Sequence, residues 1–267
     1  MKKVSNVTIG TDPELFIYDS FQNKVISSIG IIPGEKGRAF KPKGFKKGFG
    51  LQIDNILAEF NIPPVTSKEE FVNNICKMKN YIDKFVKTVN PNYTILCKAS
   101  YRVDEDQLQS PEAKLFGCCP DYNVYTERIN EAPQGECTNL RTTGTHIHVG
   151  YNNPDIETSL TLIMMMDVFL GIPSVVLDTD VDRRSLYGKA GCFRITPYGF
   201  EYRTLSGYFI SSTSLMEFLY DQTMKCIESY NKGDFSVLSL DHNLVQDIIN
   251  KGDTNKAKEI IKKYNLM

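Results

Sequence analysis

The stretch Thr145-His146-Ile147-His148-Val149-Gly150 decides how this chain of 267 residues is interpreted. In a β-strand, side chains two residues apart point to the same face, so His146 and His148 would share one face of a sheet. They are two of only three histidines in the chain. Because imidazole binds metals and donates hydrogen bonds at neutral pH, the pair indicates a metal or phosphate site. The alternative is two hydrogen-bonded core histidines, but carboxylates on other predicted strands favour the site.

The composition is that of an ordinary globular protein. Hydrophobic residues make up 41% and charged residues 24% of the sequence. The length of 267 residues suits one large domain or two small ones. The net charge of −1 gives no reason to expect nucleic-acid or membrane binding. The seven cysteines are odd in number and form no CxxC motif, and Met1-Lys2-Lys3 leads into a strand-like run. We therefore expect reduced thiols in a cytoplasmic protein.

One apolar stretch, Leu160 to Leu177, is about long enough to span a membrane. Asp167 lies near its middle, where an acidic residue costs roughly 2.5–3.5 kcal/mol on insertion. Gly171 and Pro173 also interrupt the stretch. The sequence therefore predicts a buried helix of a soluble protein, followed by a break.

The first predicted strand, Val7 to Tyr18, carries two acidic residues on one face, Asp12 and Glu14. Two carboxylates so placed repel each other unless a cation or a set of donors lies between them. Pro13 removes a backbone donor and indicates an edge position or a bulge. A pair of solvated charges is the equally weighted alternative to a site.

A second acidic strand is predicted over Leu51 to Asn61. Its alternation places Glu59 on the face of Leu57, between Ala58 and Phe60, as a semi-buried carboxylate. Asp54 falls on the opposite face unless a bulge intervenes.

Between these strands lies a basic, glycine-rich segment, Pro33 to Gly50. It holds six lysines and arginines against Glu35, a local charge of +5. It contains no Walker motif and no dinucleotide-binding glycine fingerprint. A solvated flexible loop is the favoured interpretation, and a mobile lid over an anionic ligand is the functional alternative.

Arginine is concentrated late in the chain, between Arg183 and Arg194. The strand predicted over Phe200 to Ser206 then places Glu201 and Arg203 on one face. This pair is either a buried structural ion pair or a metal ligand beside a phosphate-binding guanidinium.

The remaining pattern is mainly helical. Asp104 to Asn139 is long and irregular, and Cys118 and Cys119 within it make a weak nucleophile because no histidine is close in sequence. Caps and apolar stripes predict helices at Ser67–Val89, Pro154–Leu170, Ser212–Asn231, Asp241–Asn250 and Thr254–Tyr264. The last two would pack as an appendage, residues 236–267, on a domain of residues 1–235.

The candidate residues suit phosphoryl transfer. Carboxylates with one or two imidazoles favour Mg²⁺ or Mn²⁺ over a thiolate zinc site. Divalent cations beside several guanidiniums hold phosphate groups and stabilise the charge that develops during transfer. The candidate ligands are Asp12, Glu14, Glu59, His146, His148 and Glu201, and the candidate anion binders are Arg183, Arg184, Arg194 and Arg203.

Five motifs together resemble the phage-type carboxylate-amine ligases, amidoligases related to glutamine synthetase and glutamate-cysteine ligase. Any one of them is weak, but five in the same order are fairly specific, and they cover about residues 7 to 210. The motifs are Gly10-Thr11-Asp12-Pro13-Glu14-Leu15-Phe16, Asp54-Asn55 with Glu59-Phe60-Asn61, Leu140-Arg141-Thr142 with His146-Ile147-His148-Val149-Gly150, Arg183-Arg184-Ser185-Leu186-Tyr187-Gly188 with Gly191 and Phe193-Arg194, and Gly199-Phe200-Glu201-Tyr202-Arg203.

The resemblance implies an α+β fold in which a curved antiparallel sheet forms a funnel and helices pack on its outer face. It implies an ATP-dependent ligase that transfers the γ-phosphoryl group to a carboxylate and forms an amide from the acyl phosphate. The implied metal ligands for Mg²⁺ or Mn²⁺ are Asp12, Glu14, Glu59, His146 and Glu201. The implied nucleotide-binding residues are His148, Lys189, Arg194 and Arg203, and the implied catalytic residues are Arg183, Arg184, Arg194, Glu201 and Arg203.

Some features depart from glutamine synthetase itself. The first strand has an Asp and a Glu instead of two Glu, and Gly199 stands where an arginine is expected. These departures leave the carboxylate and amine open, as small molecules or peptides. They also leave two alternatives: a metal-dependent hydrolase that uses the histidine strand without ATP, and a non-catalytic relative that binds nucleotide or metal. Neither nucleic acid nor membrane is an expected partner, the oligomeric state is open, and a phage-encoded chain would act in the host cytoplasm.

Overall fold

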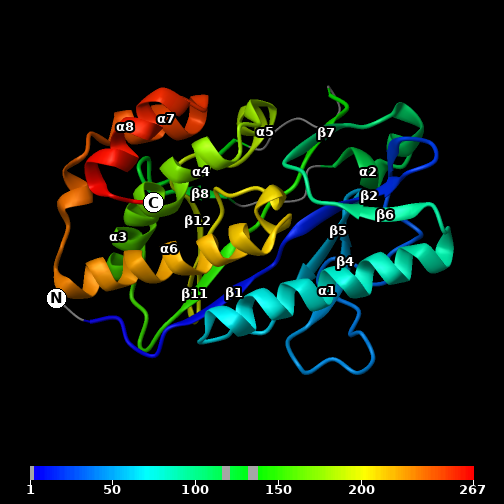
Figure 1. Ribbon diagram of the computed structural model, residues 1–267, viewed down its shortest axis with the longest axis horizontal. Coiled ribbons are helices and arrows are strands. Elements are labelled where there is room, and N and C mark those ends of the chain that lie inside the picture. The colour runs from blue at the N-terminus through cyan, green and yellow to red at the C-terminus, as the bar shows by residue number, and fades with distance from the viewer. Residues whose placement is uncertain (1–2, 116–120, 132–137) are drawn as a thin grey trace.

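The histidine strand lies inside an antiparallel sheet in the computed structural model, which describes residues 3–115, 121–131 and 138–267. β11 (Ile147–Gly150) pairs with β1 (Thr8–Thr11) on one side and with β13 (Gly199–Tyr202) on the other. The full strand order is β1-β11-β13-β12-β8-β9, where β12 is Cys192–Thr196, β8 is Tyr122–Asn123 and β9 is Arg128–Ile129. Segments far apart in sequence therefore meet in one sheet (Figure 1).

A second antiparallel sheet has the order β3-β2-β5-β4, and β6 (Tyr93–Leu96) also pairs with β2. Its strands are β2 (Glu14–Asp19), β3 (Lys24–Ile26), β4 (Gly50–Asp54) and β5 (Leu57–Asn61). A two-stranded ribbon joins β7 (Ser100–Arg102) to β10 (Leu140–Thr142). With helices packed around these strands, the predicted α+β class is confirmed.

The strand predicted over Val7 to Tyr18 is divided between the two sheets. β1 ends at Thr11 and β2 begins at Glu14, so Asp12 and Pro13 form the link. Pro13 has no backbone N–H for a ladder, which explains the interruption that its presence indicated. The link places the two predicted carboxylates where the sheets meet.

The strand predicted over Leu51 to Asn61 is a hairpin of two strands, β4 and β5, so a single strand was wrong. Asn55 adopts a left-handed backbone conformation at φ 61°, which Asn tolerates better than most residues. Gln52 pairs with Glu59 and Asp54 with Leu57 across the hairpin. The turn brings Asp54 toward the same region as Glu59.

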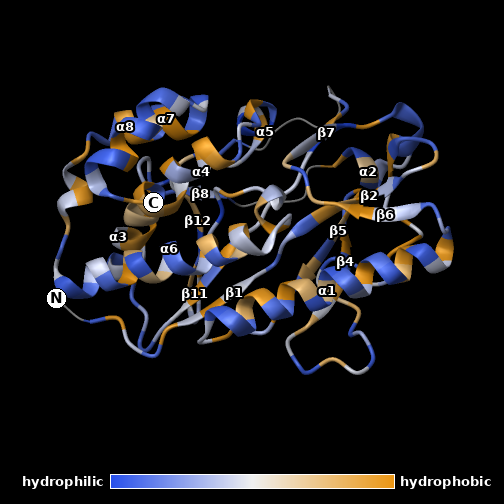
Figure 2. Ribbon diagram, in the orientation of Figure 1, coloured by the Kyte–Doolittle hydropathy of each residue, from blue (hydrophilic) through white to orange (hydrophobic). Residues whose placement is uncertain are grey.

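Long amphipathic helices lie along the strands. α1 (Lys68–Val89) begins at the Ser67 cap and α6 (Thr213–Lys232) at the Ser212 cap, as predicted. The two helices contact each other, and Figure 2 shows hydrophobic and hydrophilic residues alternating along both, as a half-buried helix requires. Their buried side chains join one core that reaches both sheets.

The apolar helix continues further than predicted. α3 (Ile156–Met166) leads into a π-helical segment, η3 (Asp167–Gly171), and then into α4 (Ile172–Leu177). The predicted break is therefore wrong: the wider π turn precedes Pro173, which then lies in the first turn of α4, where a missing N–H is tolerated. By length and composition this run could cross a membrane, but 67% of its most apolar window is buried. It packs against α6 and β13 as a core helix.

The chain ends in two helices at the predicted positions, α7 (His242–Lys251) and α8 (Thr254–Tyr264). They pack on α4, and α7 also contacts α5 (Val181–Leu186). Short elements complete the described chain: α2 (Pro111–Lys114) and the 3₁₀ turns η1 (Glu105–Leu108), η4 (Gly207–Ile210) and η5 (Ser236–Ser239). Cys118 and Cys119 lie outside the described residues.

Candidate functional site

Asp12 lies between the two histidines of the motif. Its Oδ1 is 3.0 Å from His146 Nδ1 and 3.2 Å from His148 Nε2. Burial would raise the pKa of Asp12, but the two imidazoles hold it well below its usual range. Burial would likewise lower the pKa of His148, and Asp12 raises it instead. The link between the sheets and the histidine strand therefore form one electrostatic unit.

Two more carboxylates face each other beside this unit. Glu14 on β2 and Glu59 on β5 are register partners. Glu14 Oε2 accepts a hydrogen bond from the backbone N–H of Gly144 at 2.6 Å, and Glu59 accepts one from Gln52 Nε2 at 2.8 Å. Burial, followed by repulsion from neighbouring carboxylates, raises the pKa of Glu14 and raises that of Glu59 well above its usual value.

Asp54 belongs to the same acidic group. It contributes to the raised pKa of both Glu14 and Glu59, and Lys36 Nζ lies 3.2 Å from its Oδ1. The sequence placed Asp54 on the far face of a single strand, whereas the hairpin brings it back. Four carboxylates thus repel one another across the meeting point of the sheets, and a cation there would relieve the repulsion.

Two guanidinium groups, those of Arg194 and Arg203, meet at Glu201. Glu201 lies directly across from His148 on one side and from Arg194 on the other. Glu201 Oε2 accepts from Arg203 Nη1 at 2.9 Å and from Arg194 Nη1 at 3.2 Å. Arg203 Nη1 is also 3.4 Å from His146 Nδ1. Strand alternation predicted that Glu201 and Arg203 share a face, and the register places His148 and Arg194 on either side of Glu201.

Asp121 is a member that the sequence did not single out. Its Oδ1 accepts from Arg203 Nε at 3.1 Å, and its Oδ2 accepts from Asn130 at 3.2 Å. It precedes β8 in a region read as irregular loop, where an isolated aspartate carries no signal. Only the pairing of β8 with β12 brings it to Arg203.

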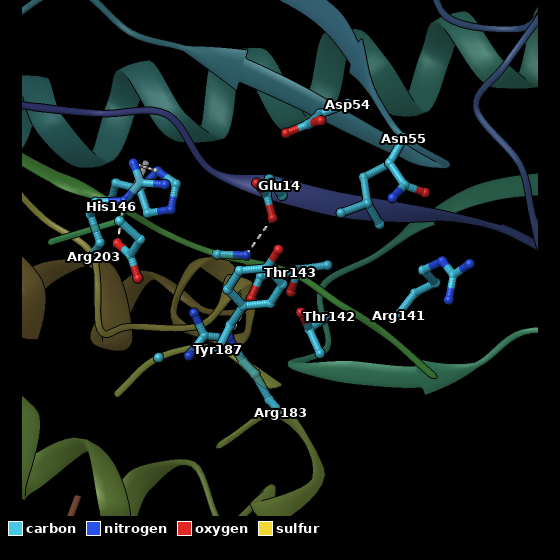
Figure 3. A pocket seen from close by; sticks show the side chains of 14 residues that line it. Glu14, Asp54, Asn55, Arg141, Thr142, Thr143, His146, Arg183, Tyr187 and Arg203 are labelled. Atoms are coloured by element: carbon cyan, nitrogen blue, oxygen red, sulfur yellow. Dashed lines mark hydrogen bonds and ion pairs between the residues drawn. The ribbon is translucent and has the colours of Figure 1, made fainter. Parts of the chain in front are cut away.

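Two cavities open on either side of the cluster, by which we mean the charged residues described above: Asp12, Glu14, Asp54, Glu59, Asp121, His146, His148, Arg194, Glu201 and Arg203. The wider one, about 520 Å³, is lined by Asp12, Glu59, His148 and Tyr198, among others. The narrower one, about 40 Å³, is lined by residues that include Glu14, Asp54, Asp121, His146 and Arg203. Figure 3 shows Glu14 near the middle of the narrow cavity, with Asp54 on one side, Tyr187 on the other and His146 and Arg203 beyond it. The cluster thus separates a roomy compartment from a small polar one.

Three predicted basic residues are engaged elsewhere. Arg183 lines the narrow cavity, but its guanidinium donates to the backbone carbonyls of Thr143, Thr204 and Leu205 at 2.7 to 2.8 Å. Arg184 donates to Ile249 O and Ser174 Oγ, and Lys189 donates to Arg184 O. Arg184 and Lys189 line neither cavity, so the structure does not bring them to the cluster.

The donors suit Mg²⁺ in kind, although their geometry is not that of a formed metal site. Within residues 3–115, 121–131 and 138–267, no group of three or more His, Cys, Asp or Glu is arranged to hold a metal ion. Asp12 Oδ1 and His148 Nε2 are buried and make no hydrogen bond of regular geometry, although they lie 3.2 Å apart as an ion pair. Carboxylate oxygens are the ligands that Mg²⁺ prefers, so the acidic group and the buried Asp12 oxygen fit a cation.

Comparison with known proteins agrees with the motifs. Residues 134–265 match the family described as phage phiEco32-like COOH.NH2 ligase-type 2. The resemblance to carboxylate-amine ligases is thereby confirmed. The matched range contains His146, His148, Arg194, Glu201 and Arg203, whereas the acidic residues from Asp12 to Glu59 precede it. No curated protein matches the chain.

Proposed function

Because residues 134–265 belong to the phage phiEco32-like COOH.NH2 ligase-type 2 family, we propose that this protein is an ATP- and Mg²⁺-dependent ligase that joins a carboxylate to an amine. The substrate carboxylate attacks the γ-phosphorus of ATP, the bond to the β-phosphate oxygen breaks, and ADP leaves. The amine then attacks the acyl phosphate, the carbon–oxygen bond to phosphate breaks, and the amine loses a proton. One observation carries the proposal: four mutually repelling carboxylates lie beside a guanidinium pair held by Glu201.

Asp12, Glu14, Glu59, His146 and Glu201 are the residues that would hold Mg²⁺. When bound, the cation neutralises charge on the phosphate oxygens. In its absence the carboxylates repel one another, which is consistent with the raised pKa values of Glu14 and Glu59. The acidic group is therefore more stable with a bound cation than without one.

The size of the two cavities supports an assignment of substrates. Ligand pockets commonly enclose roughly 300–1,000 Å³, so the wider cavity of about 520 Å³ suits the nucleotide. His148 and Asp12 line it, and His148 lies across from Glu201, which binds the two arginines. The narrow cavity suits the reacting end of the carboxylate or amine substrate.

The guanidiniums perform the electrostatic part of the reaction. Arg203 and Arg194 would contact the transferring phosphoryl group and stabilise the charge that develops on it. Glu201 accepts from both, which fixes their orientation before substrate binds. Preorganisation of this kind avoids reorienting the charged groups during the transfer.

The wider architecture is part of the same proposal. Residues 1–235 form the catalytic domain, with the strands arranged as a glutamine synthetase-like funnel, and residues 236–267 form the packed appendage. The protein acts in the cytoplasm on small-molecule or peptide substrates. The described antiparallel sheets and the packing of α7 and α8 on α4 are consistent with this arrangement.

Production of ADP tests the proposal. Purified protein is incubated with Mg²⁺, ATP and a mixture of amino acids and peptides, and ADP and amide products are measured. Glu201→Ala should abolish turnover, at least about a hundredfold, with little loss of folded protein. The matched control, Glu228→Ala, removes a carboxylate that is 60% exposed on α6 and should leave turnover unchanged. Wild-type turnover in Glu201→Ala, or metal-dependent hydrolysis without ATP, would contradict the assignment.

A further inference from the structure

The basic segment of residues 33–50 carries more positive charge than its neighbours neutralise. Lys36 pairs with Asp54 at 3.2 Å, and Arg38 pairs with Glu35 at 3.2 Å. The other four cations are exposed and form no ion pair with any residue that the structure describes: Lys41, Lys43, Lys46 and Lys47. We call these four residues the lysine rim. Like charges that no acidic residue compensates repel one another in the folded protein, and together they attract an anion.

The backbone of the segment is anchored. Phe40 and Leu51 exchange two backbone hydrogen bonds, at 2.7 and 2.9 Å. The ring of Phe45 packs edge-on against Phe49 and against Tyr81 of α1, with centroids 5.1 and 5.3 Å apart. Lys77 Nζ lies 4.3 Å from the centroid of Phe45. The backbone that carries Lys46 and Lys47 is therefore anchored by Phe45 on one side and Phe49 on the other.

The anchored segment ends at the wider cavity. Gly48, one residue after Lys47, lines this cavity together with Asn61, whose side chain donates to Gly48 O. The same cavity wall carries Asp12 and Glu59. An anion that enters this cavity meets carboxylates on its wall, and the segment that carries the four lysines begins at its edge, with Lys47 next to Gly48.

We propose that the lysine rim captures the polyphosphate of an incoming nucleotide and directs it into the wider cavity. The inference rests on the proposed function, which assigns that cavity to ATP. The physical reason is charge: a polyanion is repelled by the inner carboxylates until it is bound, whereas nearby cations raise its local concentration and its association rate. Fields of this kind raise association rates by roughly 10- to 1,000-fold and weaken with salt.

The test measures association directly. The loop variant replaces Lys41, Lys43, Lys46 and Lys47 with glutamine. The control variant removes the same charge from α8, by glutamine at Lys256, Lys258, Lys262 and Lys263, and Figure 1 shows α8 on the opposite side of the molecule from the segment below α1. The probe is ATP with a fluorophore on the ribose, mixed with Mg²⁺ in a stopped-flow instrument at low and high ionic strength.

The loop variant should associate about tenfold more slowly than wild type at low ionic strength, and the difference should shrink at high ionic strength. The dissociation rate should change little, and the α8 control should match wild type. If the four substitutions impair folding, Lys46→Gln with Lys47→Gln gives the same test at about half the charge change. Equal association rates for the loop variant and the control would overturn the role assigned to the lysine rim. The proposed function would stand, since nucleotide would still bind. Absence of nucleotide binding by wild type would overturn the proposed function and the rim with it.

Discussion

Replacing Asp167 with asparagine should stabilise this protein increasingly as the pH rises. Asp167 is fully buried at the start of the π-helical segment. Its Oδ1 accepts from the hydroxyl of Tyr202 at 2.7 Å, and its Oδ2 accepts from the hydroxyl of Tyr125 at 2.8 Å. Burial raises the pKa of Asp167 to about 7, although both phenols act to lower it.

The size of the effect comes from proton linkage. A carboxyl with a pKa of about 7 in the folded chain and 3.8 otherwise holds its proton more tightly in the folded state. Stability from this proton is therefore complete below about pH 4 and is lost as the pH rises to 7. The full loss corresponds to about 4 kcal/mol, and the part between pH 5 and pH 8 to about 3 kcal/mol.

Asparagine keeps the shape of the side chain and cannot ionise. Its oxygen can accept from one phenol, and its NH₂ can donate to the oxygen of the other. The advantage of Asp167→Asn over wild type should thus grow by about 3 kcal/mol between pH 5 and pH 8.

Urea unfolding of both proteins at the two pH values, with a chelator present, measures this change. Glu14, Glu59 and the other titrating groups are common to both proteins, so their contributions cancel in the comparison. Parallel stability curves across this pH range would refute the argument, because they would show that Asp167 does not carry a proton into neutral solution.

Two further substitutions test the site and its support. Glu59→Gln removes a carboxyl whose pKa is raised well above its usual value by burial and by neighbouring carboxylates. The folded form of this variant should therefore gain stability at pH 8 without metal but lose its response to Mg²⁺. Melting curves with and without MgCl₂ check this, and an undiminished Mg²⁺ response would count against Glu59 as a ligand. Arg183→Gln removes three buried hydrogen bonds, and it leaves the Thr204 carbonyl without a donor, while Thr143 O and Leu205 O still accept from Gly207 N and Thr145 N. It should cost about 3 kcal/mol in urea unfolding, whereas Arg38→Gln, 83% exposed, should change stability by about 0.5 kcal/mol or less. A small loss of stability in Arg183→Gln would instead indicate that this guanidinium is available to bind substrate.

Local pattern was sufficient for several parts of this protein. The caps at Ser67 and Ser212 fixed where the long helices begin, because a side-chain oxygen there satisfies a free backbone N–H whatever lies elsewhere. Strand alternation placed Glu201 and Arg203 on one face, and they do contact each other. The order of the motifs also indicated the ligase family that residues 134–265 match.

Other features depended on contacts between distant segments, which no local pattern encodes. Asp54 joins the acidic group only because Asn55 turns the chain, and Asp121 reaches Arg203 only because β8 pairs with β12. Arg183 looked like an anion binder, but each of its three guanidinium nitrogens donates to a backbone carbonyl, of Thr143, Thr204 or Leu205. Sequence by itself determined which residue types and faces were available. The tertiary structure decided which charges meet, because a charged side chain takes its partner from whatever the fold brings within a few ångströms.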